Sequence, residues 1–173
     1  GISQFLEQAA KEAGVENIGF GIGVAWSDYN NDGYLDAFVT NNAHVMICDG
    51  QPNKLFRNKA DGTFEDVTGV TGVEDLGNGM GVAWCDYDND GDQDIYVLNF
   101  DNYDFNPPEN TPSILYKNNG DESFTRVADS AGVTNAMGGF GVAWGDYNND
   151  GFMDIFIANL KDIYPSAKNV LFR

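Results

Sequence analysis

The chain repeats itself with a period near sixty residues, and this repeat constrains the fold more than any other feature. The acidic stretches "DYNNDGYLD", "DYDNDGDQD" and "DYNNDGFMD" begin at residues 28, 86 and 146, so the steps are 58 and 60 residues. "GVAW" precedes each stretch, and "DAFVTN", "DIYVLN" or "DIFIAN" ends it in register. Repeats of this length are typical of one supersecondary unit that stacks on its neighbours to share a core.

Each complete unit predicts four short strands, because apolar and polar residues alternate and Val, Ile, Phe, Tyr and Trp are frequent. In the middle copy these strands cover 53–58, 63–68, 80–87 and 94–100. "KADG" at 59–62 resembles a tight hairpin in which Asp-Gly supplies the positive backbone angles. Four recurring antiparallel strands are typical of a propeller blade, so we expect an all-β chain made of β-propeller blades.

The repeat boundaries follow from the same alignment. We expect one propeller segment over 1–173, with units at about 1–52, 53–112 and 113–168. The first unit lacks its opening strand, and 169–173 ("NVLFR") begins a further blade. The segment "FLEQAAKEAG" near the start is open to two interpretations: its Ala, Glu, Gln and Lys content favours a helix, whereas its register with the second strand of later copies favours a strand.

The acidic stretches have the composition of a cation-binding loop. Side-chain oxygens fall at positions 1, 3, 5 and 9, glycine stands at position 6, and position 7 would contribute its backbone carbonyl. Calcium takes about 6 to 8 hard oxygen ligands, whereas zinc prefers nitrogen or sulfur. We therefore predict about three calcium ions, held by Asp28, Asn30, Asp32, Tyr34 and Asp36; by Asp86, Asp88, Asp90, Asp92 and Asp94; and by Asp146, Asn148, Asp150, Phe152 and Asp154.

Two alternatives compete with this interpretation. An EF-hand opens in the same way but needs a Glu at position 12, where this chain has Val39, Val97 and Ile157. Asp, Asn and Gly also make good turns without an ion, although a turn does not require carboxylates at the same positions in three loops. Asp86, Asp88, Asp90 and Asp94 supply four ligand carboxylates against three in each other loop, so the second loop is predicted to bind calcium most tightly.

The net charge of −18 argues against nucleic acid and anionic membrane as partners, and cations are the natural counterpart. No apolar run reaches the roughly 18 to 20 residues that span a bilayer, so membrane insertion is not expected. The chain begins without Met, which suggests processing or a fragment. Cys48 and Cys85 match neither a metal cluster nor a disulfide-dense scaffold, and a bond between them stays open.

"LFRNKADGTFEDVTGVTGV", followed by "GMGVAWCDYDNDGDQDIYVLN", resembles the FG-GAP/VCBS repeats of integrin-like β-propellers. The resemblance is closest to the repeats of cartilage-acidic-protein and ASPIC/UnbV-type proteins, and it covers nearly the whole chain. It implies an extracellular, secreted or cell-surface propeller, usually of about seven blades, that calcium stabilises and that serves adhesion, matrix or recognition roles. The ligand positions of that family's loop carry over to all three acidic stretches.

Three blades are fewer than the four to eight of a closed propeller. We therefore expect a segment of a larger ring, or a ring completed by another copy. Self-association through exposed strand edges, or a protein partner at the variable connections 41–52, 101–112 and 159–168, follows from this expectation, and a glycan is a further candidate ligand. Trp26, Trp84 and Trp144 are expected to pack between blades.

The predicted function is a non-enzymatic calcium-binding module in which calcium rigidifies the loops between strands. The alternative is the propeller scaffold of a secreted polysaccharide-active enzyme or a glycan-binding protein. Beyond the acidic loops, however, the sequence shows no convergent set of His, Arg, Lys or Tyr that would carry such chemistry.

Overall fold

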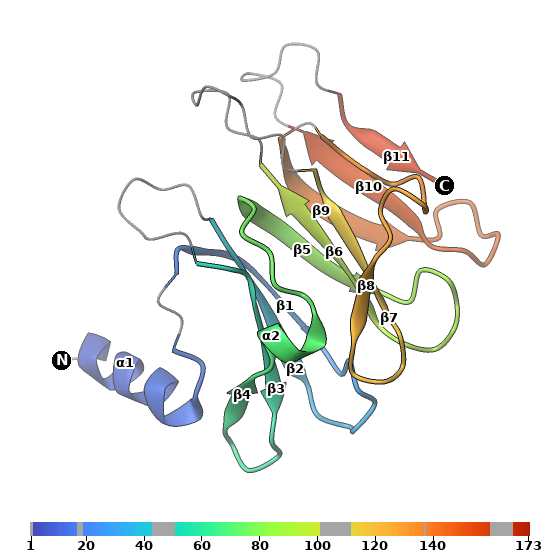
Figure 1. The fold of residues 1–173 in the computed structure, drawn as a ribbon. Coiled ribbons are helices and arrows are strands. Elements are labelled where there is room, and N and C mark those ends of the chain that lie inside the picture. Colours follow the sequence, from blue (N-terminus) through green and yellow to red (C-terminus); the bar gives the residue numbers. More distant parts are fainter. Residues whose placement is uncertain (1, 17–18, 43–50, 101–111, 137, 160–167) are drawn as a thin grey trace.

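The structure is a computed structural model that describes residues 2–16, 19–42, 51–100, 112–136, 138–159 and 168–173 (Figure 1). It confirms the prediction of an all-β chain made of propeller-like blades, because its strands form antiparallel sheets that lie side by side without closing into a ring. The strands are β1 (Gly21–Ser27), β2 (Asp36–Asn41), β3 (Lys54–Asn58), β4 (Phe64–Asp66), β5 (Gly79–Cys85), β6 (Asp94–Asn99), β7 (Ile114–Asn118), β8 (Phe124–Arg126), β9 (Gly139–Gly145), β10 (Asp154–Asn159) and β11 (Val170–Phe172).

The strands are grouped half a repeat away from the predicted grouping. Sheet 1 has the order β1-β2-β3-β4, sheet 2 has β5-β6-β7-β8, and sheet 3 has β9-β10-β11. The expectation that 53–58, 63–68, 80–87 and 94–100 form one blade is therefore wrong. The opening hairpin of each sequence unit pairs with the last strand of the unit before it, as in the pairing of Phe38 with Leu55 between β2 and β3. Likewise β11 pairs with β10 and does not begin a new blade.

The segment near the start is a helix, as its composition favoured. The strand interpretation, which rested on alignment with later copies, is wrong. Helix α1 (Ile2–Ala13) is followed by Gly14 at φ +77°, whose backbone N–H donates to the Lys11 carbonyl at 3.1 Å. Glycine adopts this left-handed conformation at no steric cost, which is why helices often end at it. The second helix, α2 (Thr68–Thr71), is a single turn just beyond β4, so the strand predicted at 63–68 is shorter than expected.

The hairpin predicted at 59–62 is present, although its dihedral angles differ from the expectation. Gly62 has a φ of +86°, as expected, but the other positive φ belongs to Ala60 rather than Asp61. The Asp61 carboxylate instead accepts the Thr63 backbone N–H at 2.9 Å. Asp61 thus shapes the turn by capping a backbone amide.

The strands that carry "GVAW" lie next to one another across the three sheets, with β5 between β1 and β9 (Figure 1). Their approach is close enough to require glycine. A Cβ atom placed on Gly23 would lie 2.6 Å from the Met80 carbonyl oxygen, inside van der Waals contact. The glycine of this motif therefore lets neighbouring sheets meet along these strands.

Two apolar cores fill the spaces between the sheets. The first core, between sheets 1 and 2, is made of Tyr29, Phe38, Leu55, Val67, Val73, Ile95, Val97, Ile114, Tyr116 and Phe124. The second core, between sheets 2 and 3, is made of Tyr96, Leu98, Leu115, Ala128, Ile155 and Ile157. Successive residues of β6 thus point into different cores, and all six positions of that strand are buried.

Trp84 and Trp144 pack against these cores, as expected of residues between blades. Trp84 meets the ring of Phe38 in sheet 1 edge-on, with centroids 6.3 Å apart, and donates its indole N–H to the Ala25 carbonyl at 3.2 Å. Trp144 meets Tyr96 of sheet 2 in the same edge-on way at 6.1 Å. Trp26, by contrast, remains 54% exposed.

Several expectations lie outside the described residues. These are most of the three variable connections, together with Cys48. Cys85 is buried and carries a free thiol, and burial raises the pKa of this thiol to about 12. Within the described residues, the structure contains no helix long and apolar enough to cross a bilayer.

The sharing of cores between sheets predicts the cost of a single cavity. Leu115→Ala removes a side chain with no exposed surface from the second core and should lower the free energy of unfolding by about 2 to 5 kcal/mol. Denaturant titration followed by tryptophan fluorescence measures this loss. Leu76→Ala, at a position 64% exposed, is the matched control and should change stability by no more than about 0.5 kcal/mol. Equal losses for the two variants would contradict the shared core.

Candidate metal centre

The three acidic loops each connect the first two strands of a sheet, and they are built alike. The first carboxylate of each loop accepts two backbone N–H groups from within the loop: Asp28 accepts those of Asp32 and Gly33 at 3.0 and 2.8 Å. Asp86 and Asp146 make the same pair of bonds in their loops. The glycine at position 6 has a φ of +89°, +96° and +88° in the three loops, as the sharp turn requires.

The last carboxylate of each loop is the first residue of the following strand and is buried. Asp94 is 1% exposed, and its two oxygens accept the backbone N–H groups of Tyr87 at 3.1 Å and Asn118 at 2.8 Å. Asp36 is held in the same way by Tyr29 and Asn58. In the first two sheets this carboxylate therefore ties the loop to the third strand as well as to the second, whereas Asp154 accepts the Tyr147 backbone N–H at 3.1 Å.

Burial makes the negative charge of this carboxylate costly. Desolvation raises the pKa of Asp94 to about 6, and the nearby carboxylates of Asp88 and Asp90 add to the rise, although the two backbone N–H donors oppose it. Burial raises the pKa of Asp36 above its ordinary value for the same reason. A cation beside these groups would offset the cost.

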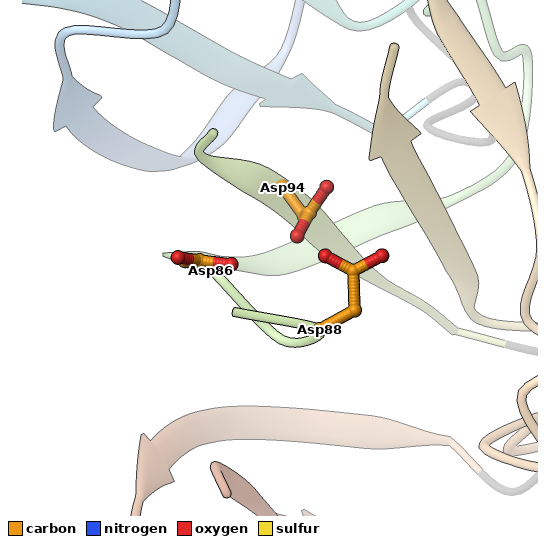
Figure 2. A group of neighbouring side chains, drawn as sticks. All are labelled: Asp86, Asp88 and Asp94. Carbon is orange, nitrogen blue, oxygen red and sulfur yellow. The ribbon is translucent and has the colours of Figure 1, made fainter. Parts of the chain in front are cut away.

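The second loop brings three predicted ligands together. Figure 2 shows the carboxylates of Asp86, Asp88 and Asp94, whose oxygens lie within 4.8 Å of one another. Oxygens that bind one calcium ion at about 2.3 to 2.6 Å can be at most about 5 Å apart, so this spacing suits a single ion. Asp86 and Asp88 come from the loop and Asp94 from the start of β6.

A lysine ammonium already lies in the second loop. Lys117, on β7, forms ion pairs with Asp88 and, at 2.7 Å, with Asp90. These contacts raise the pKa of Lys117 above its ordinary value, and the same lysine is the main reason that the pKa of Asp90 lies below its ordinary range. The loop therefore holds a positive charge among the predicted ligands through electrostatic attraction to their carboxylates, and a metal ion would be held by the same attraction.

The first and third loops do not gather three carboxylates in this way within the described part of the chain. An amide stands at position 3 in each, and it donates to the carboxylate two residues on: Asn30 to Asp32 at 3.0 Å and Asn148 to Asp150 at 2.9 Å. The contribution of the backbone carbonyls of Tyr34, Asp92 and Phe152 stays a prediction.

In the described part of the other two sheets, the cations that correspond to Lys117 form no ion pair with a carboxylate of an acidic loop. Arg57 pairs with Glu65 at 2.9 Å and with Glu122 at 2.8 Å, and both partners lie outside the acidic loops. Arg173 lies over the ring of Tyr147 in the third loop, as Lys117 lies over the ring of Tyr87 in the second. The second loop thus differs from the others in two linked ways: it has an added carboxylate at ligand position 3, Asp88, and an ammonium ion-paired with that carboxylate.

Sequence reasoning missed the asparagine at position 4 of each loop. Asn31, Asn89 and Asn149 all have a positive φ, between 57° and 59°. The Asn31 side chain donates to the Asp92 carboxylate of the second loop at 2.9 Å, and Asn89 donates to the Gly151 carbonyl of the third loop at 3.2 Å. Position 4 therefore links each loop to the next one. The sequence feature that could have revealed this role is the asparagine at position 4 in all three copies, because asparagine tolerates a left-handed backbone better than most residues.

The fold and the loops together define a repeat protein of β-propeller blades with acidic inter-strand loops. The family model for the FG-GAP-like repeat matches residues 28–97 and 105–157, which is more than half of the chain, so the chain belongs to this family.

Its curated relatives include proteins named Cartilage acidic protein 1. The chain is 32% identical to the Xenopus tropicalis protein over 171 residues and 32% identical to the Homo sapiens protein over 173 residues. The Mus musculus protein is 30% identical over 174 residues. Each match covers 97% of this chain but only 23 to 24% of the relative, so the chain spans about a quarter of their length.

The buried carboxylate gives a pH prediction. In calcium-free buffer the Asp94 carboxyl should titrate near pH 6, because burial raises its pKa from the ordinary value near 4. Between these pH values the folded chain holds a proton that the unfolded chain has released. The contribution of Asp94 to the free energy of unfolding therefore falls as pH rises through that window. NMR titration of the carboxyl carbon measures the midpoint. The exposed Asp61, whose pKa is lowered by its bonds to Thr63, is the internal control, and equal midpoints would contradict the site as described.

Proposed function

We propose that this chain is a calcium-binding repeat module that acts outside the cell in a structural, adhesive or interaction role. The observation that carries the proposal is that the first carboxylate organises all three loops through the same backbone bonds, and that the side chains at ligand positions 1, 3, 5 and 9 are carboxylates and amides. Oxygen-only donors in this number suit calcium better than zinc, and magnesium tolerates so crowded a set less well. Asp28, Asp32 and Asp36, with their counterparts in the other loops, would hold the ions.

Calcium in this position would stabilise the blades rather than perform chemistry. Each loop joins two strands, and in the first and second loops the last carboxylate also bonds the third strand, so an ion there would fix three strands at one edge of the sheet. Carboxylates about 4 Å apart repel by roughly 4 kcal/mol at an effective dielectric of 20, and an ion would remove that repulsion. At calcium about ten times the dissociation constant, each site would add about 1.4 kcal/mol to stability.

The extracellular assignment rests on chemistry and on the relatives. Calcium sites of extracellular modules commonly have dissociation constants of about 10⁻⁴ to 10⁻³ M, and such weak sites fill only where calcium is abundant. The similar proteins carry cartilage in their names. The strong acidity also supports a role away from nucleic acid, because the net charge of −18 would still be −12 with three calcium ions bound.

A non-catalytic role is favoured over a polysaccharide-active enzyme. The carboxylates that could act as acid and base are engaged in turn hydrogen bonds, and Asp90 is also paired with Lys117. A carboxylate held by such donors, or by a metal, is a poor proton carrier. The proposal is therefore a scaffold whose recognition surfaces lie elsewhere on the blades.

The first test is the number of ions. We expect three calcium ions per chain in isothermal titration calorimetry, and a melting temperature that rises with calcium and falls with chelator. Asp146→Asn should reduce the number to two, because it weakens the carboxylate that organises the third loop. Asp121→Asn is the matched control: this exposed carboxylate only caps the Ser123 turn, so three ions should remain. Wild-type protein that binds no calcium would contradict the proposal.

Lys117 changes the expected order of affinities among the loops. The second loop has the most carboxylates, but its lysine must be displaced before an ion can use Asp88 and Asp90 fully. Lys117→Met should therefore tighten calcium binding to this loop by about three- to tenfold, the worth of one or two partly exposed ion pairs. Calorimetry in an Asp28→Asn, Asp146→Asn background isolates the second loop.

The control for this prediction is Lys54→Met. This substitution removes the same charge as Lys117→Met, but Lys54 pairs with Asp66, which lies outside the acidic loops. If both lysine variants tighten binding equally, the effect is one of net charge and Lys117 has no special role.

A further inference from the structure

One buried side chain joins the first acidic loop to sheet 2. The side-chain amide of Asn118, on β7, donates to the Tyr29 backbone carbonyl at 2.8 Å, and each of these residues is only 1% exposed. Tyr29 is the second residue of the first loop, and its ring packs on Phe124 of β8 with centroids 5.8 Å apart. A residue of the first loop is therefore held against sheet 2 both by its carbonyl and by its ring.

The same two residues hold the buried carboxylates of both loops. The Tyr29 backbone N–H donates to Asp36 at 3.2 Å, and the Asn118 backbone N–H donates to Asp94 at 2.8 Å. Asp36 and Asp94 stand at ligand position 9 of the first and second loops, and neither is more than 1% exposed. Hydrogen bonds through Tyr29 and Asn118 thus connect the last ligand position of one loop to that of the next.

On the basis of the calcium sites proposed above, we propose that Asn118 is a positioning residue through which an ion in the first loop tightens binding of an ion in the second. Tyr29 lies between Asp28 and Asn30, two predicted ligands, so an ion on them would fix the Tyr29 carbonyl. The fixed carbonyl holds the Asn118 side chain, and the Asn118 backbone N–H then holds Asp94 in place for the second ion. Each ion spares the other part of the cost of ordering its loop, so the effect is reciprocal.

The bond through Asn118 is buried, unlike the other contact between these two loops. Asn31 donates to Asp92 at 2.9 Å in an exposed position, where water can replace the bond at little cost. The Tyr29 carbonyl has no such substitute in the interior, where an unpaired polar group is costly. A change of order in the first loop therefore reaches the second loop mainly through Asn118.

The sign of the coupling separates this route from simple electrostatics. An ion in one loop cancels part of the negative field that attracts the next ion, and screening over about 8 Å at physiological ionic strength only weakens that effect. Charge alone therefore predicts that the first ion weakens binding of the second. The route through Asn118 predicts the opposite.

Sheet 1 provides a comparison residue. Asn58 and Asn118 are the last residues of the third strands of their sheets, and each makes three corresponding hydrogen bonds within its own sheet. The partners are Asp36, Leu35 and Ala60 for Asn58, and Asp94, Gln93 and Gly120 for Asn118. Among the described residues, Asn58 makes no bond to a second acidic loop. The bond to Tyr29 is what distinguishes Asn118.

Isothermal titration calorimetry with calcium alone measures the coupling. Asp146→Asn disables the third loop and leaves two sites, and adding Asp86→Asn or Asp28→Asn leaves only the first or only the second loop. The coupling factor is the two-ion binding constant of the Asp146→Asn protein divided by the product of the two single-loop constants, and it equals one for independent loops. We expect a coupling factor of about five, the effect of one buried hydrogen bond.

The two asparagines provide the variant and its matched control. Asn118→Leu removes the side-chain amide but keeps the backbone N–H that bonds Asp94, and it should bring the coupling factor to one. Asn58→Leu removes the corresponding bonds within a sheet but no bond between loops, so the coupling factor should stay near five. A residue with a merely structural role would change stability without changing this factor.

Hydrogen exchange tests the same route without a substitution at Asn118. In the Asp86→Asn, Asp146→Asn protein, calcium can enter only the first loop, yet exchange of the Asn118 backbone amide in sheet 2 should slow by about fivefold. The Val133 backbone amide, which donates to the Ala128 carbonyl at 3.0 Å, is the control and should exchange at an unchanged rate.

The outcomes separate this inference from the proposed function. A coupling factor of one or less, equal effects of the two asparagine variants, or an unchanged exchange rate at Asn118 would each overturn the coupling and leave the calcium sites in place. Absence of calcium binding to any loop would overturn the coupling and the proposed function together.

Discussion

The structure depends on the packing of one sheet face against the next. A four-stranded sheet with apolar residues on both faces cannot fold alone, and β6 shows the consequence most clearly. All six of its residues are buried, with Ile95 and Val97 in the first core and Tyr96 and Leu98 in the second. Stacking is therefore a condition of folding for this chain, and each sheet serves as half of the core of its neighbour. The close approach at Gly23 is the geometric counterpart of the same requirement.

The acidic loops are built onto this core rather than beside it. Asp94 begins the strand whose next residue, Ile95, is fully buried, so the charged group is placed by the packing of the strand. The low dielectric that raises its pKa also strengthens its bonds to the N–H groups of Tyr87 and Asn118. A negative charge at the edge of a hydrophobic strand is thus paired with fixed donors. The asparagines at position 4 then connect one such edge to the next.

The sequence predicted the strands, the loops and the inter-sheet role of Trp84 and Trp144 because these features depend on local pattern repeated three times. It did not predict which strands share a sheet. A periodic sequence shows which strands each repeat contains, but it does not show at which strand a sheet begins. The pairing of Phe38 with Leu55 shows that the sheet begins at the "GVAW" strand. Helix α1 was ambiguous for a related reason, since alignment to later copies competed with its helical composition. In both cases the missing information was tertiary.

Lys117 illustrates a limit of a different kind. Counting ligand carboxylates ranks the second loop highest, because Asp88 stands where the other loops have Asn30 and Asn148. The structure brings an ammonium from β7 to that added carboxylate, whereas Arg57 at the corresponding position turns to Glu65 and Glu122. With Lys117 beside it, the second loop of five aspartates exceeds the three aspartates of each other loop by one negative charge instead of two. The field that attracts a cation is therefore more even across the three loops than their sequences suggest. The affinity of such a loop depends on charges delivered by a strand more than twenty residues away as much as on the loop itself.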